Sequence, residues 1–212
     1  MMANDDAVSK PSRVTRRKFL YAVVITAPAA FLPAGSFGAE KGQPDLKPTP
    51  AAGKPLTPEE TAGPFFRPNS PAKNNFREQG VKGDPLKLAG TVLDLKGRPV
   101  KGALIDFWHA DGAGDYDLKG FKCRGHQFTD ADGRYSLETV VPGLYPGRTR
   151  HYHLRIQAAH GPVLTTQLFF PNEARNAEDS LFRQDLLLTM HETMHDSGTA
   201  KVAAFDFVIR TS

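Results

Sequence analysis

Short apolar runs alternate with polar turn residues along the chain from Leu86 onward. Each run spans about four to eight residues and is bounded by Gly, Pro or Asp, a pattern typical of β-strands rather than helices. Two runs follow turn sequences that end in Gly, DLKG at 94–97 and DADG at 130–133, and Gly supplies the positive φ that tight hairpin turns need. We expect strands at 88–93, 100–108, 127–129, 134–137, 151–158, 164–170 and 202–209.

Strands of this length and spacing predict an all-β fold, an antiparallel β-sandwich with long loops. At 212 residues the chain accommodates one such domain and a short tail. Only the segment 180–195 has a spacing compatible with an amphipathic helix, and the sequence has no internal repeat.

The N-terminal residues differ in character from the rest of the chain. TRRKFL at 15–20 opens an apolar run, 19–37, that Pro28 and Pro33 interrupt. A run this short and broken predicts a signal peptide at 1–39 rather than a membrane span, although an uncleaved anchor helix is the alternative. The paired arginines resemble a twin-arginine signal, which implies that the export machinery carries the folded protein to the periplasm or beyond. Residues 40–55, rich in Pro, Lys and Gly, predict a disordered linker, and 56–212 the sandwich domain.

Charge and cysteine content narrow the possible partners. The chain has 27 Lys and Arg residues, of which five precede residue 40, and 23 Asp and Glu residues, of which two do. From residue 40 onward, 22 basic residues therefore face 21 acidic ones. A nearly neutral body argues against nucleic acid or an acidic membrane as a partner, because both require a clustered positive field. The single cysteine, Cys123, excludes an intrachain disulfide and is expected to be a small packed side chain.

A histidine pair in a predicted strand is the first candidate for chemistry. His151 and His153 are two residues apart, so both imidazoles project from the same face of a strand. Such a pair forms half of a metal site, but by itself it is more typical of a solvated sheet face. Two tyrosines occur in turn-rich segments upstream, Tyr116 after WHADGAGD and Tyr145 within PGLYPGR. Each tyrosine alone is equally compatible with a packed aromatic at a strand end.

Five ordered segments surround these residues: TAGPFF at 61–66, GTVLDLKGRPV at 90–100, TDADGRY at 129–135, PGLY at 142–145 and TQLFFP at 166–171. Together they resemble the intradiol ring-cleavage dioxygenases of the protocatechuate 3,4-dioxygenase type. Any one segment is weak evidence, whereas the ordered set is specific. The resemblance extends from about Thr61 to the C-terminus and implies the β-sandwich of that family.

The resemblance implies one mononuclear Fe(III) per chain and a reaction with small molecules. Both atoms of O2 would enter a catechol-type aromatic ring and give a muconate-type dicarboxylic acid. Phenolate oxygen is a hard anionic donor that favours oxidised iron, and the metal charge lowers the pKa of the phenol. The implied ligands are Tyr116, Tyr145, His151 and His153.

The resemblance also assigns residues around the metal. Arg148 and Tyr145 would be catalytic, and the guanidinium would stabilise negative charge that develops on a bound catecholate. Without the resemblance, Arg148 is compatible with a surface arginine like Arg150. The residues expected to bind substrate are Gln167, Trp108, Gly63 and Pro64. Trp108 is equally compatible with a place in the sandwich core.

Two other functions compete with this interpretation. HETMH at 191–195 fits the His-Glu-x-x-His pattern of zinc metalloproteases, which requires His191 and His195 on a helix. A third ligand would have to come from Asp196 or Asp206 downstream. A non-catalytic secreted β-sandwich that binds another molecule is the second alternative, but it does not require two tyrosines and two histidines to converge.

Several points stay open at this level. His126 is compatible with a polar pocket wall or with an exposed strand position. The link from Tyr145 to His151 is short compared with some family members, which suggests an open pocket. The sequence does not select among catechol, protocatechuate, hydroxyquinol and larger catechols, or between a monomer and a homo-oligomer.

Overall fold

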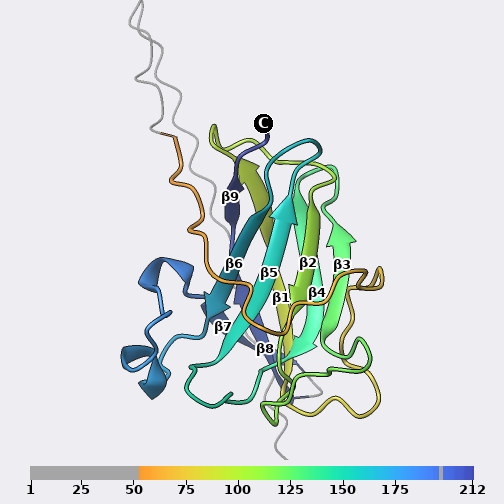
Figure 1. Ribbon diagram of the computed structural model, residues 1–212, viewed down its shortest axis with the longest axis vertical. Coiled ribbons are helices and arrows are strands. Elements are labelled where there is room, and N and C mark those ends of the chain that lie inside the picture. Colours follow the sequence, from red (N-terminus) through yellow and green to blue (C-terminus); the bar gives the residue numbers. More distant parts are fainter. Residues whose placement is uncertain (1–52, 196–197) are drawn as a thin grey trace, which may run out of the picture. The chain divides into compact units, whose positions relative to one another are not determined.

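The computed structural model of the protein describes residues 53–195 and 198–212. The predicted export signal and residues 40–52 of the predicted linker lie outside this part. Two sheets face each other (Figure 1), one of five strands in the order β4-β1-β8-β7 with β9 also paired to β1, and one of four strands in the order β3-β2-β5-β6. The strands are β1 (Pro85–Asp94), β2 (Leu104–Trp108), β3 (Arg124–Phe128), β4 (Arg134–Val140), β5 (His151–Gln157), β6 (Leu164–Phe169), β7 (Thr189–His195), β8 (Gly198–Ala204) and β9 (Phe207–Ile209).

The all-β prediction and the predicted sandwich are confirmed, and most ladders are antiparallel. All three ladders of the four-stranded sheet are antiparallel, as are β1 with β4 and β7 with β8. β1 also pairs in parallel with β8 and β9, which return to it from the C-terminal end of the chain. The five-stranded sheet is therefore mixed rather than purely antiparallel.

The core forms where the alternating apolar positions of both sheets meet. β1 contributes Leu86 and Leu88 from one sheet, and β5 contributes Tyr152, Leu154 and Ile156 from the other, all at most 1% exposed. Residues one position away on β5 point to the opposite face, because side chains alternate along a strand. The inner face of the four-stranded sheet therefore builds the core, and its outer face carries His151 and His153.

That outer face is covered as well, which explains why β5 is buried on both sides at 151–154. The N-terminal segment 57–76 runs across it (Figure 1, orange to yellow). The Glu60 amide donates to the Thr165 carbonyl on β6, and the Lys73 amide donates to the His126 carbonyl on β3. The cover gives polar residues of the outer face a buried environment that a two-layer sandwich alone does not supply.

The predicted strand at 202–209 is interrupted, and Gly90 on β1 accounts for the break. A Cβ atom at Gly90 would lie 1.8 Å from the Phe205 carbonyl oxygen, so only glycine lets the two backbones approach. There the Phe205 amide donates to the Ala89 carbonyl, and the Asp206 carboxylate accepts from the Thr91 amide. One run therefore becomes two short strands, β8 and β9, that both follow β1.

The segment 180–195, whose spacing was compatible with an amphipathic helix, does not form one. This segment contains a 3-10 turn, η2 (Gln184–Leu186), followed by β7, and a second 3-10 turn, η1 (Ala174–Ala177), precedes it. β7 pairs with β8 along its length, from Thr189 opposite Ala204 to His195 opposite Gly198. Pairing with a neighbouring strand satisfies the backbone groups of this segment and overrides its weak helical pattern.

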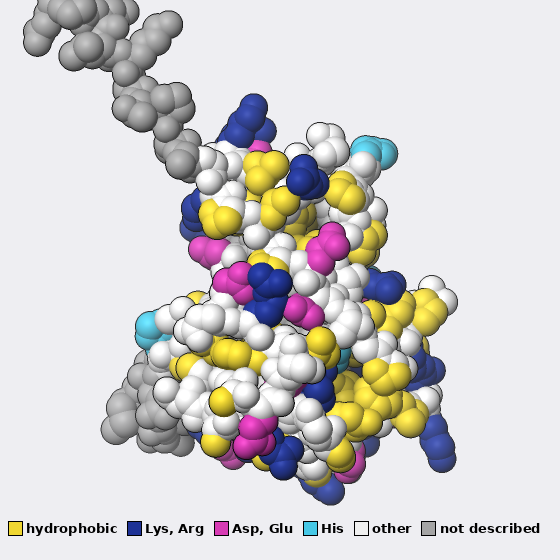
Figure 2. All heavy atoms as spheres, turned by 60° about the vertical axis from the view of Figure 1, so that its left-hand side comes forward, with side chains coloured by type: hydrophobic (Ala, Val, Ile, Leu, Met, Phe, Trp, Pro, Cys, Tyr) yellow, Lys and Arg dark blue, Asp and Glu magenta, His cyan; other side chains and the backbone are white. Residues whose placement is uncertain are grey.

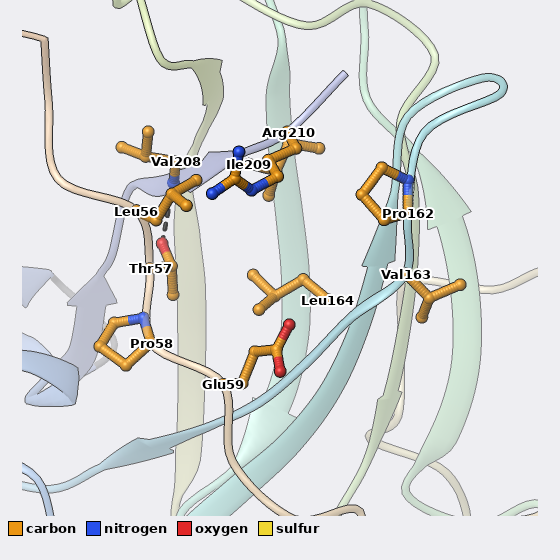
Figure 3. A pocket seen from close by; sticks show the side chains of 10 residues that line it. All are labelled: Leu56, Thr57, Pro58, Glu59, Pro162, Val163, Leu164, Val208, Ile209 and Arg210. Atoms are coloured by element: carbon orange, nitrogen blue, oxygen red, sulfur yellow. Dashed lines mark hydrogen bonds between the residues drawn. The ribbon is translucent and has the colours of Figure 1, made fainter. Parts of the chain in front are cut away.

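The start of the covering segment closes the seam between β9 and β6. Thr57 exchanges hydrogen bonds with Val208, its amide donating to the Val208 carbonyl and its hydroxyl accepting from the Val208 amide. Figure 3 shows the pocket beside this seam, with Leu56 and Leu164 on its apolar wall and Glu59 and Arg210 at its polar edge.

The surface mixes charges of both signs. On the face drawn in Figure 2, basic and acidic side chains are interspersed among apolar and neutral ones. In the described part of the chain, no helix has the length and apolar character needed to cross a membrane.

Candidate metal centre

The two histidines of β5 meet at their outer nitrogens. His151 and His153 are 5% and 2% exposed, and their Nε2 atoms are 3.1 Å apart. In the sheet, His153 lies opposite Trp108 on β2 and Gln167 on β6. The pair sits on an inner strand of the sheet, where neighbours on both sides restrict its movement.

Hydrogen bonding and stacking orient each ring. The Nδ1 of His151 lies 2.7 Å from the Thr149 carbonyl oxygen, and because a carbonyl only accepts, Nδ1 carries the proton and Nε2 keeps its lone pair. The ring of His153 stacks on Trp108 with 5.3 Å between centroids and an interplanar angle of 2°. Burial lowers the pKa of His151 to about 4 and that of His153 well below its ordinary value. Both imidazoles are therefore neutral near pH 7, the form that binds a metal.

Tyr116 brings an oxygen to the same point. Its hydroxyl lies 3.2 Å from the His151 Nε2 and donates to that nitrogen. The ring of Phe65 stacks on Tyr116 at 4.3 Å. The loop before Tyr116 is shaped by Asp111, whose carboxylate accepts from the Ala113 amide at 2.8 Å. A long loop can place Tyr116 accurately because these contacts fix its path.

Tyr145 completes the group of predicted ligands from another loop. The Arg148 amide donates to the Tyr145 carbonyl and closes a tight turn. The Tyr145 ring packs edge-on against Tyr116 at 5.8 Å between centroids and against Phe65 at 5.4 Å. The two tyrosine loops are joined by the Gly143 amide, which donates to the Asp111 carbonyl. The structure thus places the Tyr145 ring beside Tyr116 through ring contacts.

The donor set fits a hard trivalent cation. The His151 Nε2 lies 3.2 Å from the Tyr116 hydroxyl oxygen and 3.1 Å from the His153 Nε2. Two nitrogens whose lone pairs face each other repel unless a proton or cation lies between them. Burial raises the pKa of Tyr116, and the positive charges of Arg148 and Arg124 oppose this rise. A bound cation would lower that pKa further. The Nδ1 of His153 is buried without a hydrogen-bond partner.

Arg148 lies beside this centre in a buried ion pair. Its Nε donates to both carboxylate oxygens of Asp179, at 2.8 and 3.1 Å. Its Nη2 donates to the Gln167 Oε1 at 2.6 Å, and the Gln167 amide nitrogen donates to the Thr61 carbonyl at 2.9 Å. Burial acts to raise the pKa of Asp179, but the amides of Leu181 and Thr149 and the guanidinium of Arg148 lower it below its ordinary value. Arg148 is therefore not a free surface arginine, and both ends of the Gln167 amide are engaged.

The remaining predicted pocket residues border the histidines. Trp108 is 2% exposed and stacks on His153, so it lines the site rather than the sandwich core. A Cβ atom at Gly63 would lie 3.2 Å from the His153 Cε1, so the backbone of the covering segment rests directly on that ring. Pro64, next to it, is exposed.

Three residues with direct roles in the geometry were not predicted. Phe65 lay in a recognised motif without an assigned contact, and Asp179 is 31 positions from Arg148, beyond any local pattern. Arg124 is 2% exposed, and it donates to the carbonyls of Phe65 and Asp117, tying the covering segment to the Tyr116 loop. Arg124 lies in the segment FKCRG at 121–125, and nothing in that local sequence indicates that its side chain is buried.

His126 has neither of the roles considered for it. It is half-buried on the outer face of β3, and its Nδ1 donates to the Ser70 carbonyl at 2.8 Å. The Ser70 hydroxyl donates to Asp106 on β2 at 2.8 Å. His126 therefore helps to hold the covering segment on the sheet.

The His-Glu-x-x-His segment does not form the helix that a zinc site needs. It lies in β7, the edge strand of the five-stranded sheet, and His191 is exposed. In the described residues no group of three or more His, Cys, Asp or Glu side chains is placed to hold a metal ion. The zinc protease alternative has no geometric support.

Comparison with known proteins supports the family that the sequence motifs resemble. The model of a family described as "Dioxygenase" matches residues 61–211. The chain belongs to the intradiol ring-cleavage dioxygenases. It is 31% identical to the protocatechuate 3,4-dioxygenase beta chain of Burkholderia cepacia over 163 residues, 65% of this chain and 69% of that protein. It is 29% identical to 6-chlorohydroxyquinol 1,2-dioxygenase of Cupriavidus pinatubonensis over 172 residues, 69% of this chain and 62% of that relative.

A solved structure shows the same sandwich. The dioxygenase domain of a dioxygenase carbohydrate-binding protein fusion from Streptomyces sp. SirexAA-E is 46% identical, with a TM-score of 0.70 over 74% of this chain and 100% of that domain. This intradiol dioxygenase family member thus spans the whole of one relative's catalytic domain, but less than two thirds of the chlorohydroxyquinol enzyme.

Proposed function

We propose that this chain is an intradiol dioxygenase that inserts both atoms of O2 into a catechol-type ring and produces a muconate-type dicarboxylic acid. One Fe(III) per chain would be held by Tyr116, Tyr145, His151 and His153. The observation that carries the proposal is the position of the His151 Nε2, which lies 3.2 Å from the Tyr116 hydroxyl oxygen and 3.1 Å from the His153 Nε2. When bound there, Fe(III) would supply the Lewis acidity that draws electron density from a catechol.

The residues of the chain divide the remaining tasks. His151 and His153, neutral because they are buried, supply two fixed nitrogen donors. Tyr145, which packs through ring contacts, would be the ligand whose phenolate oxygen accepts the proton of one catechol hydroxyl. Tyr116, stacked under Phe65, stays in place.

Arg148 supplies positive charge where the substrate becomes electron-rich. Burial is the main influence on the pKa of Tyr116 and of His151, but the guanidinium opposes the rise for Tyr116 and adds to the lowering for His151, so its field reaches both residues. A cation held at this position stabilises negative charge on a catecholate without having to move during the reaction. Trp108 and Phe65 line the same space with aromatic surface and exclude water from it.

Oxygen uptake by iron-loaded protein tests this function. Catechol, protocatechuate and hydroxyquinol would be supplied separately, and uptake with at least one is expected, together with a visible tyrosinate-to-iron absorption band. Tyr116→Phe and Tyr145→Phe should weaken or shift that band. Tyr152→Phe is the matched control, because Tyr152 lies between the two histidines but points into the core and donates to the Val140 carbonyl. A colourless iron-loaded protein that consumes no oxygen with any of the three would overturn the proposal.

A further inference from the structure

Asp179 is the most deeply buried carboxylate that contacts the site. Only 1% of its side chain is exposed, against 17% for Arg148. Both of its oxygens accept from the Arg148 Nε, Oδ2 also accepts from the Thr149 amide at 2.9 Å, and Oδ1 accepts from the Leu181 amide at 2.9 Å. Two backbone amides therefore fix the carboxylate, and the carboxylate in turn fixes the arginine.

A second contact holds the guanidinium from its other edge. Gln167 is fully buried, and its Oε1 accepts from the Arg148 Nη2. The amide has a single possible orientation, because arginine has only donors and the Thr61 carbonyl on the far side only accepts. The guanidinium is thus clamped between Asp179, on the loop after η1, and Gln167, on β6.

A clamp of this kind is needed because the arginine has little local support. Arg148 ends a tight turn between β4 and β5, and a long arginine side chain has many rotamers of similar energy. Nearby Arg150 shows the weaker arrangement, since its partner Glu173 leaves the pair 29% and 27% exposed. Arg150 also donates to the Pro142 carbonyl, so it is the deeper burial of the Arg148–Asp179 pair that distinguishes it from an ordinary surface ion pair.

We propose that Asp179 is a positioning residue that orients the Arg148 guanidinium toward the metal centre, with Gln167 as the opposing contact. The inference rests on the proposed dioxygenase function, because it concerns the charge that stabilises the bound catecholate. Arg148 would be positively charged without Asp179, but its guanidinium would not be held in one orientation.

Asp179→Asn tests the idea with the smallest change in shape. The Asn amide nitrogen cannot accept from Arg148, so the guanidinium loses one of its two carboxylate contacts and the charge of its partner. We expect kcat to fall on the order of 10²-fold, the cost typical of a small misplacement of a catalytic group, with little change in KM. Glu173→Gln, which breaks the Arg150 pair nearby, is the matched control and should leave kcat unchanged.

A double-mutant cycle separates positioning from a general structural role. If Asp179 acts through Arg148, then Asp179→Asn should lower kcat less than about two-fold in an Arg148→Gln background. Iron content and the visible band should stay the same in all four proteins, since neither residue is a ligand. Losses of kcat that multiply in the double variant, or a full kcat in Asp179→Asn, would overturn the inference.

Arg148→Lys gives a second route if Asp179→Asn fails to fold, as urea unfolding of the metal-free protein would show. Lysine keeps the charge but cannot contact Asp179 and Gln167 in the same planar arrangement. Its kcat should also fall on the order of 10²-fold, and a full kcat would overturn the inference. A wild-type protein that is inactive on all catechols overturns the proposed function and this inference together. An active wild type that fails the cycle overturns only the inference.

Discussion

Two histidine pairs of this chain lie in β-strands, and they differ in spacing and in the position of their strands within the sheets. His151 and His153 occupy β5, an inner strand, two residues apart and nearly fully buried. His191 and His195 occupy β7, an edge strand, four residues apart. In an extended strand that separation is roughly 13 Å, at about 3.3 Å per residue, whereas on a helix the same spacing stacks one side chain above the other.

The contrast shows that the sequence spacing of two residues determines whether their side chains meet only once the secondary structure is known. In a strand, two residues separated by two positions place their side chains on the same face, because side chains alternate between the faces. In a helix, two residues separated by four positions lie close together on one face, but residues 189–195 form a strand. The environment adds a second difference, since the covering segment 57–76 buries the β5 pair and holds it neutral, while His191 faces solvent.

The largest effect should come from removing a histidine of the β5 pair. His151→Ala deletes a donor from the centre, so iron affinity should fall by more than the roughly 10–100-fold that loss of a supporting residue costs. Iron per chain and the visible band measure this. The double variant His191→Ala/His195→Ala is the control and should bind iron as the wild type does. Iron loss in the control, with retention in His151→Ala, would move the metal site to β7.

A smaller effect concerns His109, which is fully buried at the end of β2 outside the metal centre. Its Nδ1 donates to the Ala110 carbonyl, and its Nε2 accepts from the Thr139 hydroxyl. Burial lowers the pKa of His109 to about 4. In the unfolded chain the pKa of this histidine is near 6.5, so between about pH 4 and 6.5 the unfolded state binds more protons than the folded state. The free energy of unfolding is therefore highest above about pH 6.5 and falls as the pH drops toward 4.

The contribution of His109 over that range is on the order of 3 kcal/mol. Urea unfolding of metal-free protein between about pH 4.5 and 7.5 should show the slope, and His109→Gln should flatten it. The buried pair of β5 contributes with the same sign, so part of the slope will persist. His191→Gln is the exposed control and should leave the slope unchanged. A slope that is equal in all three proteins would contradict the role of burial.

The smallest effect should come from Gly63→Ala. Gly63 has a φ of 63°, and its added Cβ would lie 3.2 Å from the His153 ring. Gly102 is the control, because its φ is 68° but no atom lies within 4 Å of an added Cβ. Both alanine variants should lose roughly 1–2 kcal/mol of stability from the left-handed backbone. Only Gly63→Ala should also weaken iron binding, and equal weakening in both would rule out contact with His153 as the cause.

Local patterns predicted much of the sandwich. The alternation around 151–158 and the glycine-containing turns at 94–97 and 130–133 reflect rules that operate within a few residues, and the strands they predicted are present. Local patterns did not identify β7, because pairing with β8 determines the conformation of that segment. They also joined β8 to β9 in one run, because the close approach of two backbones at Gly90 is not visible in the hydrophobic pattern.

The histidine pair and its shared face follow from sequence alone, because a strand places residues two apart on one side. Its burial does not, because the covering segment reaches β5 from about a hundred residues away in the chain. The tyrosines were found through ordered motifs, but only the folded loops, joined through Asp111, bring Tyr116 within 3.2 Å of His151. Asp179 was beyond prediction for the same reason. Its partner is fixed by how the loop after η1 packs on β5, and tertiary packing alone determines that contact.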